Sequence, residues 1–427
     1  MTQTMRVSQP SDLISLIPYQ LGYAPTRSLV VVSLSGEPHT VGVIARCDLL
    51  DVDDPNTVTA IVRACQRDEA RKIFPVVYLD PDRGSTSFDL HDEDRIDVLR
   101  AFSSLGQSAG HLVNKHDLWI VASDGAVAWC EVIRCNETHC TLGPHGSQRY
   151  ASHEDMKSSR ISAAMVVAGR SYVARREDLL ATQETDQLHR LDMDERVVEW
   201  EDRWALASDC VSRTALRHAA VQSVTALLAQ RHAHDAPHRE CISPQECSAR
   251  DGSWVLAGQN SELWATIGAA IDDTCVRDGL LVAMTPLGVE ALAAYAQADE
   301  CGDDLCMGGS DCVVWPARDK MACEALQFIM HAPTATAPQH CGFTDMMDLL
   351  RQGVTFIPER HHAPFHTLLA LGYWWQGDGA RASLHLDKAH QCDATYRLAL
   401  LLQTVLRAGL APAWARRQSD RDESEIS

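Results

Sequence analysis

The sequence predicts an N-terminal α/β (α+β) domain built on a mixed sheet, followed by an all-α C-terminal region. Two observations carry this prediction. Short β-rich runs alternate with amphipathic helical segments up to about residue 180, and beyond about residue 185 the strand signal fades while helical periodicity continues. We therefore expect a domain at 1–180, a helical region at 185–330 with a linker around 232–250, a C-terminal helical module at 340–416 and a polar tail at 417–427.

The elements of the first domain each have a local signal. β-rich composition predicts strands, and apolar residues at i, i+3, i+4 and i+7 predict helices. In chain order we expect strands at 28–34 and 40–49 joined as a hairpin, a helix after Pro55, a buried strand at 74–80, a helix at 92–113, strands within 117–123 and 126–133, and a helix at 155–168. Asp124-Gly125 is a typical hairpin turn between the last two strands. This mixture favours a sheet with both parallel and antiparallel pairs.

The C-terminal half is predicted to be helical throughout. Long helical patterns cover 194–235, 261–277 and 287–298. The most specific local signal lies at 364–410, where small residues at Ala382 and Ala389 and a turn at Gly377-Asp378 match one tetratricopeptide-like helix pair. Only one such unit is present, so we interpret it as a helical hairpin that caps a larger helical region and not as a solenoid.

Charge and composition restrict the classes of function. The chain has 427 residues, 58 acidic and 38 basic, which gives a net charge of −20. Nucleic acids and anionic membranes both attract an excess of Lys and Arg, so neither partner is expected. The first 20 residues lack the apolar core of a signal peptide and no apolar run is long enough to cross a membrane, so we expect a cytoplasmic protein.

The chain is rich in cysteine, with 15 residues. In the cytoplasm these thiols stay reduced. Two groupings are candidate metal sites, and they consist of Cys135, Cys140 and His145, close to Cys130, and of Cys301, Cys306 and Cys312. Structural zinc sites usually take cysteines two to four residues apart, whereas the gaps here are four or five. Scattered reduced thiols are therefore the preferred interpretation, and no cofactor is predicted.

No familiar catalytic motif stands in the sequence. It has no glycine-rich phosphate loop, no G-x-S-x-G and no H-E-x-x-H. The ligand-binding candidates are Arg46 and Asp48, two residues apart on one face of a strand, and Asp80 at the carboxyl end of another strand. The alternative interpretation makes the pair a salt bridge at the rim of the sheet and Asp80 a helix cap or turn former.

The histidines and tryptophans are interpreted conservatively. His232, His234, His238 and the pair His361-His362 have spacings that metal sites use, but nothing in the sequence pairs them with carboxylates, so no ligand role is predicted. Trp374 and Trp375 are expected to pack within the helical hairpin, with one of them open to a partner as the alternative.

Several segments together carry a family resemblance. In the first half of the chain they are the opening DLISLIPYQLGYAPTRSLVVVSL, the later ARCDL at 45–49 and AGRSYVARREDLL at 168–180. In the second half they are VRDGLLVAM at 276–284, the helix pair around Gly377-Asp378 and the ending YRLALLLQTVLRAGLAPAW at 396–414. In this order they resemble an actinobacterial family, the domain of unknown function numbered 4192, over nearly the whole chain. The resemblance implies a bacterial, cytoplasmic protein and brings no activity. The cysteine-rich segment 301–323 departs from the family pattern, as an insertion would.

Three functions follow as hypotheses. The first is a non-catalytic interaction or regulatory protein that meets a protein partner through its C-terminal helices, because catalytic motifs are missing and a tetratricopeptide-like hairpin is present. The second is an enzyme or small-ligand-binding protein with its site near Arg46, Asp48 and Asp80. The third is a metal or redox protein that uses the cysteine groupings.

Overall fold

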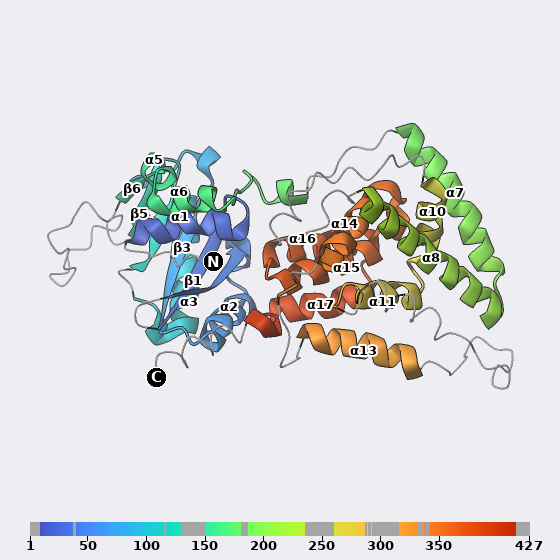
Figure 1. Cartoon of the computed structure of the whole chain (residues 1–427). Helices are drawn as coiled ribbons and strands as arrows, with labels where there is room; N and C mark the ends of the chain where they lie inside the picture. Colours follow the sequence, from blue (N-terminus) through green and yellow to red (C-terminus); the bar gives the residue numbers. More distant parts are fainter. Residues whose placement is uncertain are drawn as a thin grey trace. The chain divides into compact units, whose positions relative to one another are not determined.

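The chain folds into two compact units, and each is described here by itself (Figure 1). The first extends to Ala181 and holds the sheet, and the second comprises the helices of Thr182–Thr404. The computed structural model describes residues 9–36, 40–114, 117–129, 150–180, 187–234, 260–286, 316–330 and 341–415, with a few isolated positions between them.

A mixed six-stranded sheet forms the centre of the first unit, as predicted. Its strands are β1 (Ser28–Ser35), β2 (Thr40–Asp48), β3 (Lys72–Tyr78), β4 (Trp119–Val121), β5 (Gly125–Ala128) and β6 (Tyr150–Ser152). Their order is β2-β1-β3-β4-β5-β6, with β3 and β4 parallel and the other neighbours antiparallel. Both predicted hairpins are confirmed, β1 with β2 and β4 with β5.

Helices cover both faces of this sheet (Figure 1). Alternate strand residues such as Leu29, Val31 and Val77 pack with α2 (Pro55–Arg67) and α3 (Asp92–Ala109) in the main core. On the opposite face, α1 (Pro10–Leu21) and α6 (Arg160–Val167) pack around Leu16, Ile161 and Met165. The central strands β1, β3, β4 and β5 are buried on both sides, which explains their continuous apolar runs, whereas β2 at the sheet edge is largely half-buried.

Helix α1 was missed by the sequence analysis. Its sequence contains two prolines, and Pro18 lies inside the helix. Pro10, however, occupies the first turn, where its missing N–H costs nothing, and the Asp12 carboxylate accepts a hydrogen bond from the Gln9 backbone N–H (3.2 Å). Gly22 ends the helix in the left-handed conformation, with φ of 79°.

Three segments predicted as single helices are each two helices. The segment 155–168 divides into α5 (His153–Lys157) and α6, 194–235 into α7 (Gln187–Leu206) and α8 (Cys210–His234), and 261–277 into α10 (Ser261–Ala270) and α11 (Thr274–Ala283). A capping residue lies at each break. Ser159, Asp209 and Asp273 accept hydrogen bonds from backbone N–H groups at the start of the helix that follows.

The other helices of the second unit are α13 (Pro316–Met330), α14 (Cys341–Phe356), α15 (His362–Gln376), α16 (Gly379–Cys392) and α17 (Arg397–Arg407). Helices α15 and α16 form the predicted helical hairpin. Its turn consists of Gly377, with φ of 86°, and Asp378, whose carboxylate caps α16 through the Arg381 N–H (2.9 Å). Trp374 and Trp375 are both buried, as packing residues.

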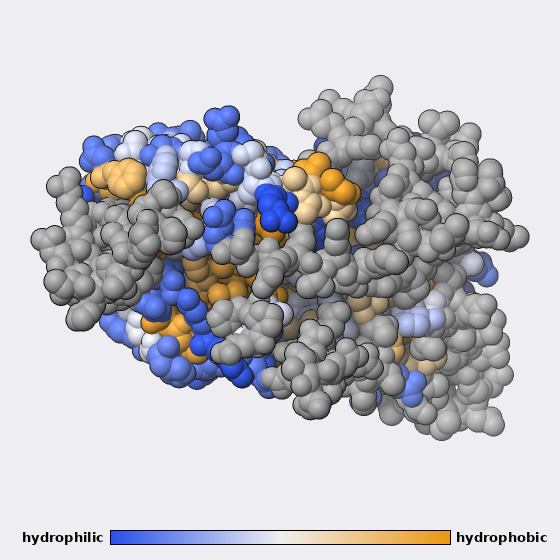
Figure 2. Space-filling view, turned by 60° about the vertical axis from the view of Figure 1, so that its left-hand side comes forward, coloured by the Kyte–Doolittle hydropathy of each residue, from blue (hydrophilic) through white to orange (hydrophobic). Residues whose placement is uncertain are grey.

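Hydrophobic residues form separate patches between hydrophilic ones on the face of the molecule shown in Figure 2. Among the helices that the structure describes, none has the length and apolar character that crossing a membrane requires.

Candidate functional site

Arg46 and Asp48 form an ion pair at the carboxyl end of β2. The Arg46 Nη1 and Nη2 donate to the two carboxylate oxygens of Asp48, at 3.0 and 2.5 Å, and its Nε donates to the Ser28 hydroxyl on the neighbouring strand at 2.9 Å. Ser28 is fully buried and donates in turn to the Thr26 carbonyl oxygen. The guanidinium is therefore held in one orientation by two strands.

Asp80 lies at the same edge of the sheet but is not part of this pair. In the register, Ser28 of β1 faces both Asp48 of β2 and Tyr78 of β3, so one strand separates the ion pair from Asp80. The Asp80 carboxylate accepts a hydrogen bond from the Asp82 N–H (3.0 Å) and caps the short 3₁₀ helix Pro81–Arg83. Within the described residues, no contact joins Asp80 to Arg46 or Asp48.

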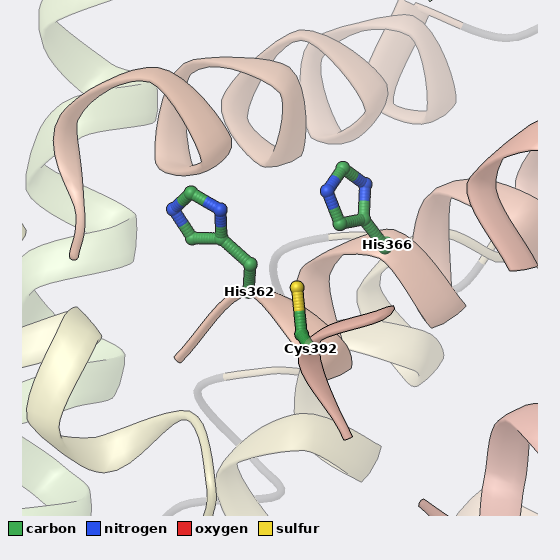
Figure 3. Close-up of side chains that lie close together, drawn as sticks. All are labelled: His362, His366 and Cys392. Atoms are coloured by element: carbon green, nitrogen blue, oxygen red, sulfur yellow. The ribbon is translucent and has the colours of Figure 1, made fainter. Parts of the chain in front are cut away.

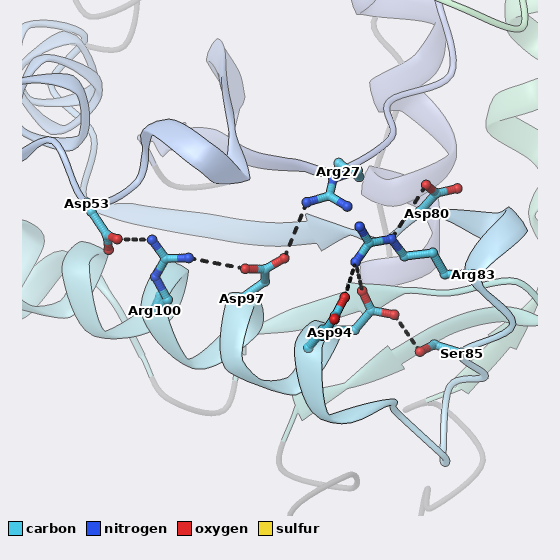
Figure 4. A network of polar contacts seen from close by, with 9 residues as sticks. Arg27, Asp53, Asp80, Arg83, Ser85, Asp94, Asp97 and Arg100 are labelled. Carbon is cyan, nitrogen blue, oxygen red and sulfur yellow. Dashed lines mark hydrogen bonds and ion pairs between the residues drawn. The ribbon is translucent and has the colours of Figure 1, made fainter.

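A chain of ion pairs along α3 was not predicted (Figure 4). Arg27 and Arg100 both approach Asp97, at 3.7 and 3.3 Å, and Arg100 also pairs with Asp53. Arg83 pairs with Glu93 and Asp94 near the beginning of the helix, at 3.1 and 3.7 Å. Asp97 and Arg100 are three residues apart on α3, but the other partners are ten or more residues apart in sequence, so no local pattern identifies the network. The carboxylates of this network bind arginines of the same unit, and we interpret it as structural.

Two distant sequence segments meet at Tyr23, and a third lies within electrostatic reach of its hydroxyl. The Val173 N–H donates to the Gly22 carbonyl and the Ala24 N–H donates to the Val173 carbonyl, both at 2.9 Å, so segment 172–180 is tied to segment 22–24. A Cβ atom on Gly22 would lie 3.3 Å from Leu179. Both belong to segments that carry the family resemblance, and another of these, ARCDL, supplies Arg46 and Asp48.

Four charged groups act on the buried Tyr23 hydroxyl. Burial raises the pKa of Tyr23, the charges of Arg46 and Arg176 oppose this effect, and those of Asp48 and Glu177 add to it. The phenol therefore stays protonated and able to donate a hydrogen bond near neutral pH. Two positive and two negative side chains within electrostatic reach of one buried hydroxyl give a polar centre with balanced charge.

Tyr78 adds a polar atom without a partner. Its side chain is buried, and its hydroxyl makes no hydrogen bond within the described part of the chain. Burial, with a smaller contribution from Tyr172, raises the pKa of Tyr78 far above its usual range. A buried hydroxyl that gains no hydrogen bond costs about 1–3 kcal/mol. Such a group is usually satisfied by a water molecule or a ligand.

The predicted cysteine groupings cannot be placed. Cys130, Cys135, Cys140 and His145, and likewise Cys301, Cys306 and Cys312, lie outside the described residues, as does His238. His232 and His234 are in the last turn of α8, and their side chains are not described. Cys323, downstream of the second grouping, is in α13 and exposed.

The histidines that precede the hairpin do have polar partners, which corrects the expectation drawn from the sequence. His361 Nδ1 lies 2.6 Å from an oxygen of Asp272, and its Nε2 lies 2.7 Å from an oxygen of Glu201. His362, the next residue, faces His366 and Cys392 (Figure 3). His366 and Cys392 were not singled out because the contacts that unite them cross between two helices.

The chain was compared with known proteins. The model of a family described as a domain of unknown function (DUF4192) matches residues 10–298 and 325–413. The chain belongs to this family. The cysteine-rich residues 301–312 fall between the two matched ranges, as expected of an insertion. No curated protein and no solved structure matched the chain.

Proposed function

We propose that this protein is a regulatory protein that binds a small polar ligand at the carboxyl edge of its sheet, beside Tyr23. This combines the regulatory function and the ligand-binding alternative expected from the sequence. The observation that carries it is the joining of two distant segments beside Tyr23 by backbone hydrogen bonds, with the fixed guanidinium of Arg46, from a third segment, within electrostatic reach of the Tyr23 hydroxyl.

The charges of this site favour a particular class of ligand. Arg46 and Asp48 are bound to each other, so a ligand would exchange with this ion pair, its anionic group facing Arg46 and Arg176 and its ammonium group facing Asp48 and Glu177. A purely anionic or purely cationic molecule would be repelled by one half of this set. Small zwitterions, of which free amino acids are the simplest, match both halves, and the buried hydroxyls of Tyr23 and Tyr78 add hydrogen-bonding groups at the same sheet edge.

Thermal unfolding in the presence of added compounds tests this function. A panel of the common free amino acids is added to the full-length protein, with inorganic phosphate and ethylamine as anionic and cationic controls. A ligand that binds only the folded protein raises the unfolding midpoint, and above its Kd the rise grows with the logarithm of the ligand concentration. We expect at least one zwitterion to raise the midpoint and neither control ion to do so.

Two variants make the test specific. Arg46→Lys keeps the positive charge but removes the planar group that bonds Ser28 and Asp48 together, so the ligand effect is expected to fall at least several-fold. Arg100→Lys changes an arginine of the α3 network and is expected to keep it. Failure of every amino acid to shift the midpoint, or an equal shift in both variants, contradicts the proposal.

A protein partner at the C-terminal helices stays a prediction. Leu400 and Leu401 of α17 have 44% and 57% of their surface exposed, which supports it. Affinity purification of the tagged protein from its native cells, with a Leu401→Glu variant as control, tests whether a specific partner is lost. An actinobacterial, cytoplasmic location belongs to the same proposal, supported by the free thiols among the described cysteines.

A further inference from the structure

We propose that His362, His366 and Cys392 bind a divalent transition metal ion of the zinc class. One potential ligand atom from each residue lies within 4.8 Å of the others. Donor atoms around tetrahedral zinc are about 3.4–3.8 Å apart, given metal–ligand distances of about 2.0–2.3 Å. A small movement of the side chains would therefore close the site on an ion. The proposal is independent of the ligand site in the N-terminal unit.

The helical hairpin itself brings the three residues together. His362 and His366 are one turn apart on α15, so their side chains share a face of that helix. Cys392 is the last residue of α16, which runs back along α15 after the turn at Gly377. The beginning of α15 and the end of α16 therefore meet, and Figure 3 shows the Cys392 sulfur pointing toward the space between the two imidazole rings.

Hydrogen bonds leave the facing ring nitrogens open for coordination. His362 Nε2 lies 2.6 Å from the Ile357 carbonyl oxygen, which can only accept, so Nε2 carries the proton and Nδ1 has a lone pair. His366 Nδ1 lies 3.0 Å from His385 Nδ1. When His366 donates in that pair, its Nε2 has the second lone pair. Within the described part of the chain, no hydrogen bond occupies either remaining nitrogen.

These contacts resemble the hydrogen bonds that hold histidine ligands in place around metal ions. Histidine ligands usually donate their second N–H to a carbonyl or another acceptor, which fixes the ring. Ile357 does this for His362, and His385 can do it for His366. His385 is itself stacked on Tyr373, with ring centroids 5.3 Å apart. The two histidine ligands are buried and Cys392 is exposed, so solvent reaches the site from one side.

Charged neighbours decide what completes the coordination. The carboxylate of Glu359 lies within electrostatic reach of both His362 and Cys392, whereas the exposed Arg190 acts on His362 and Lys388 on His366 and Cys392. The Lys388 ammonium group is exposed and donates to Gln391 Oε1 (3.2 Å), and water screens its repulsion of a cation. The Glu359 carboxylate is not among the donor atoms within 4.8 Å of one another, so the fourth ligand is a water molecule unless Glu359 moves closer on metal binding, and Glu359→Gln distinguishes the two.

Cobalt titration tests the site in the full-length protein after removal of metals with a chelator. Co²⁺ bound by a thiolate gives a charge-transfer band in the near ultraviolet, and tetrahedral coordination gives intense visible bands. We expect these bands in the wild type, their loss or at least a tenfold weaker affinity in Cys392→Ser, and their retention in Cys323→Ser, which changes an exposed cysteine of α13. Zn²⁺ is expected to displace the cobalt and abolish the bands.

Further variants separate this site from the cysteine groupings. Cobalt binding is also measured in a protein with Cys135, Cys140, Cys301, Cys306 and Cys312 replaced by serine, in which the bands that depend on Cys392 are expected to remain. His366→Gln, checked for folding by circular dichroism, is expected to lose them. Absence of cobalt binding in the wild type, or bands unchanged in folded Cys392→Ser, overturns the proposal.

Discussion

Arg217 binds both carboxylate oxygens of Asp273, with Nε 3.0 Å from Oδ1 and Nη2 2.8 Å from Oδ2. The same carboxylate accepts hydrogen bonds from the Cys275 and Val276 N–H groups at the start of α11. Asp273 therefore caps α11 and marks the break between α10 and α11. Its ion pair with Arg217 connects this break to α8. Its two functions can be separated by substitution.

Asp273→Ala is expected to lower the free energy of unfolding by about 2–4 kcal/mol, because it removes a helix cap and leaves a largely buried arginine without this partner. Asp273→Asn retains an oxygen for the cap and removes the charge, so its loss is expected to be smaller. Urea denaturation of both variants measures the difference. Equal loss in the two variants would show that the cap contributes nothing.

Gly22→Ala is expected to destabilise the protein by about 1–2 kcal/mol, because Gly22 has φ of 79° and its new Cβ would lie 3.3 Å from Leu179. Gly106 provides the matched control. It lies inside α3 with open space around its Cα, so Gly106→Ala is expected to stabilise the protein by about 0.5–1 kcal/mol. The two changes in thermal unfolding midpoint should have opposite signs, and two shifts of the same sign would refute this account.

Tyr78→Phe tests whether the unpaired hydroxyl of Tyr78 destabilises the folded protein or is satisfied by a bound partner. If no water or ligand satisfies it, its removal is expected to raise the free energy of unfolding by about 1 kcal/mol. The gain should grow in alkaline solution, since the folded state keeps the phenol neutral while the unfolded state ionises. Stability is measured by urea denaturation near pH 7 and near pH 10. A loss of stability at both values would instead indicate a bound partner on this hydroxyl.

Glu201 is expected to stabilise the folded protein at neutral pH and to lose this contribution in acid. Hydrogen bonds from Arg360, and more weakly from His361, lower the pKa of Glu201 from its usual 4.5. A carboxylate with a lowered folded-state pKa contributes stability above its unfolded pKa and loses it as the pH falls through the folded value. The stability difference between wild type and Glu201→Gln is thus expected to be largest near pH 7 and to shrink below about pH 4.5. Glu195→Gln, an exposed change in the same helix, should show no such trend.

The sequence predicted the fold class because periodicity is a local signal. The run of Ser28–Leu34 and the turn at Asp124-Gly125 each specify their own hairpin, and both are present. Helix breaks were harder to predict, since Ser159 and Asp209 look like ordinary polar residues until their backbone partners are known. Helix α1 was not predicted because Pro18, a residue type that usually interrupts a helix, lies inside it.

The candidate site was predictable only in part. Arg46 and Asp48 are two residues apart on one strand, so their proximity follows from the alternation of a strand. Tyr23 gains Arg176 and Glu177 as neighbours through a contact between the two ends of the first unit, which no periodicity encodes. The same holds for Cys392, whose two histidine neighbours lie on another helix.

The pairing of Tyr23 with Val173 joins two segments that are synthesised at different times, so it bears on the order in which the first unit folds. During synthesis, the segment at 22–24 leaves the ribosome long before its partner segment around Val173 is made, and contacts between residues so far apart in sequence form slowly. The surroundings of Tyr23 are therefore among the last parts of the first unit to assemble. A nascent chain stopped before residue 168 would hold the β1–β2 hairpin that carries Arg46 and Asp48, yet would lack Val173, Arg176 and Glu177 beside Tyr23.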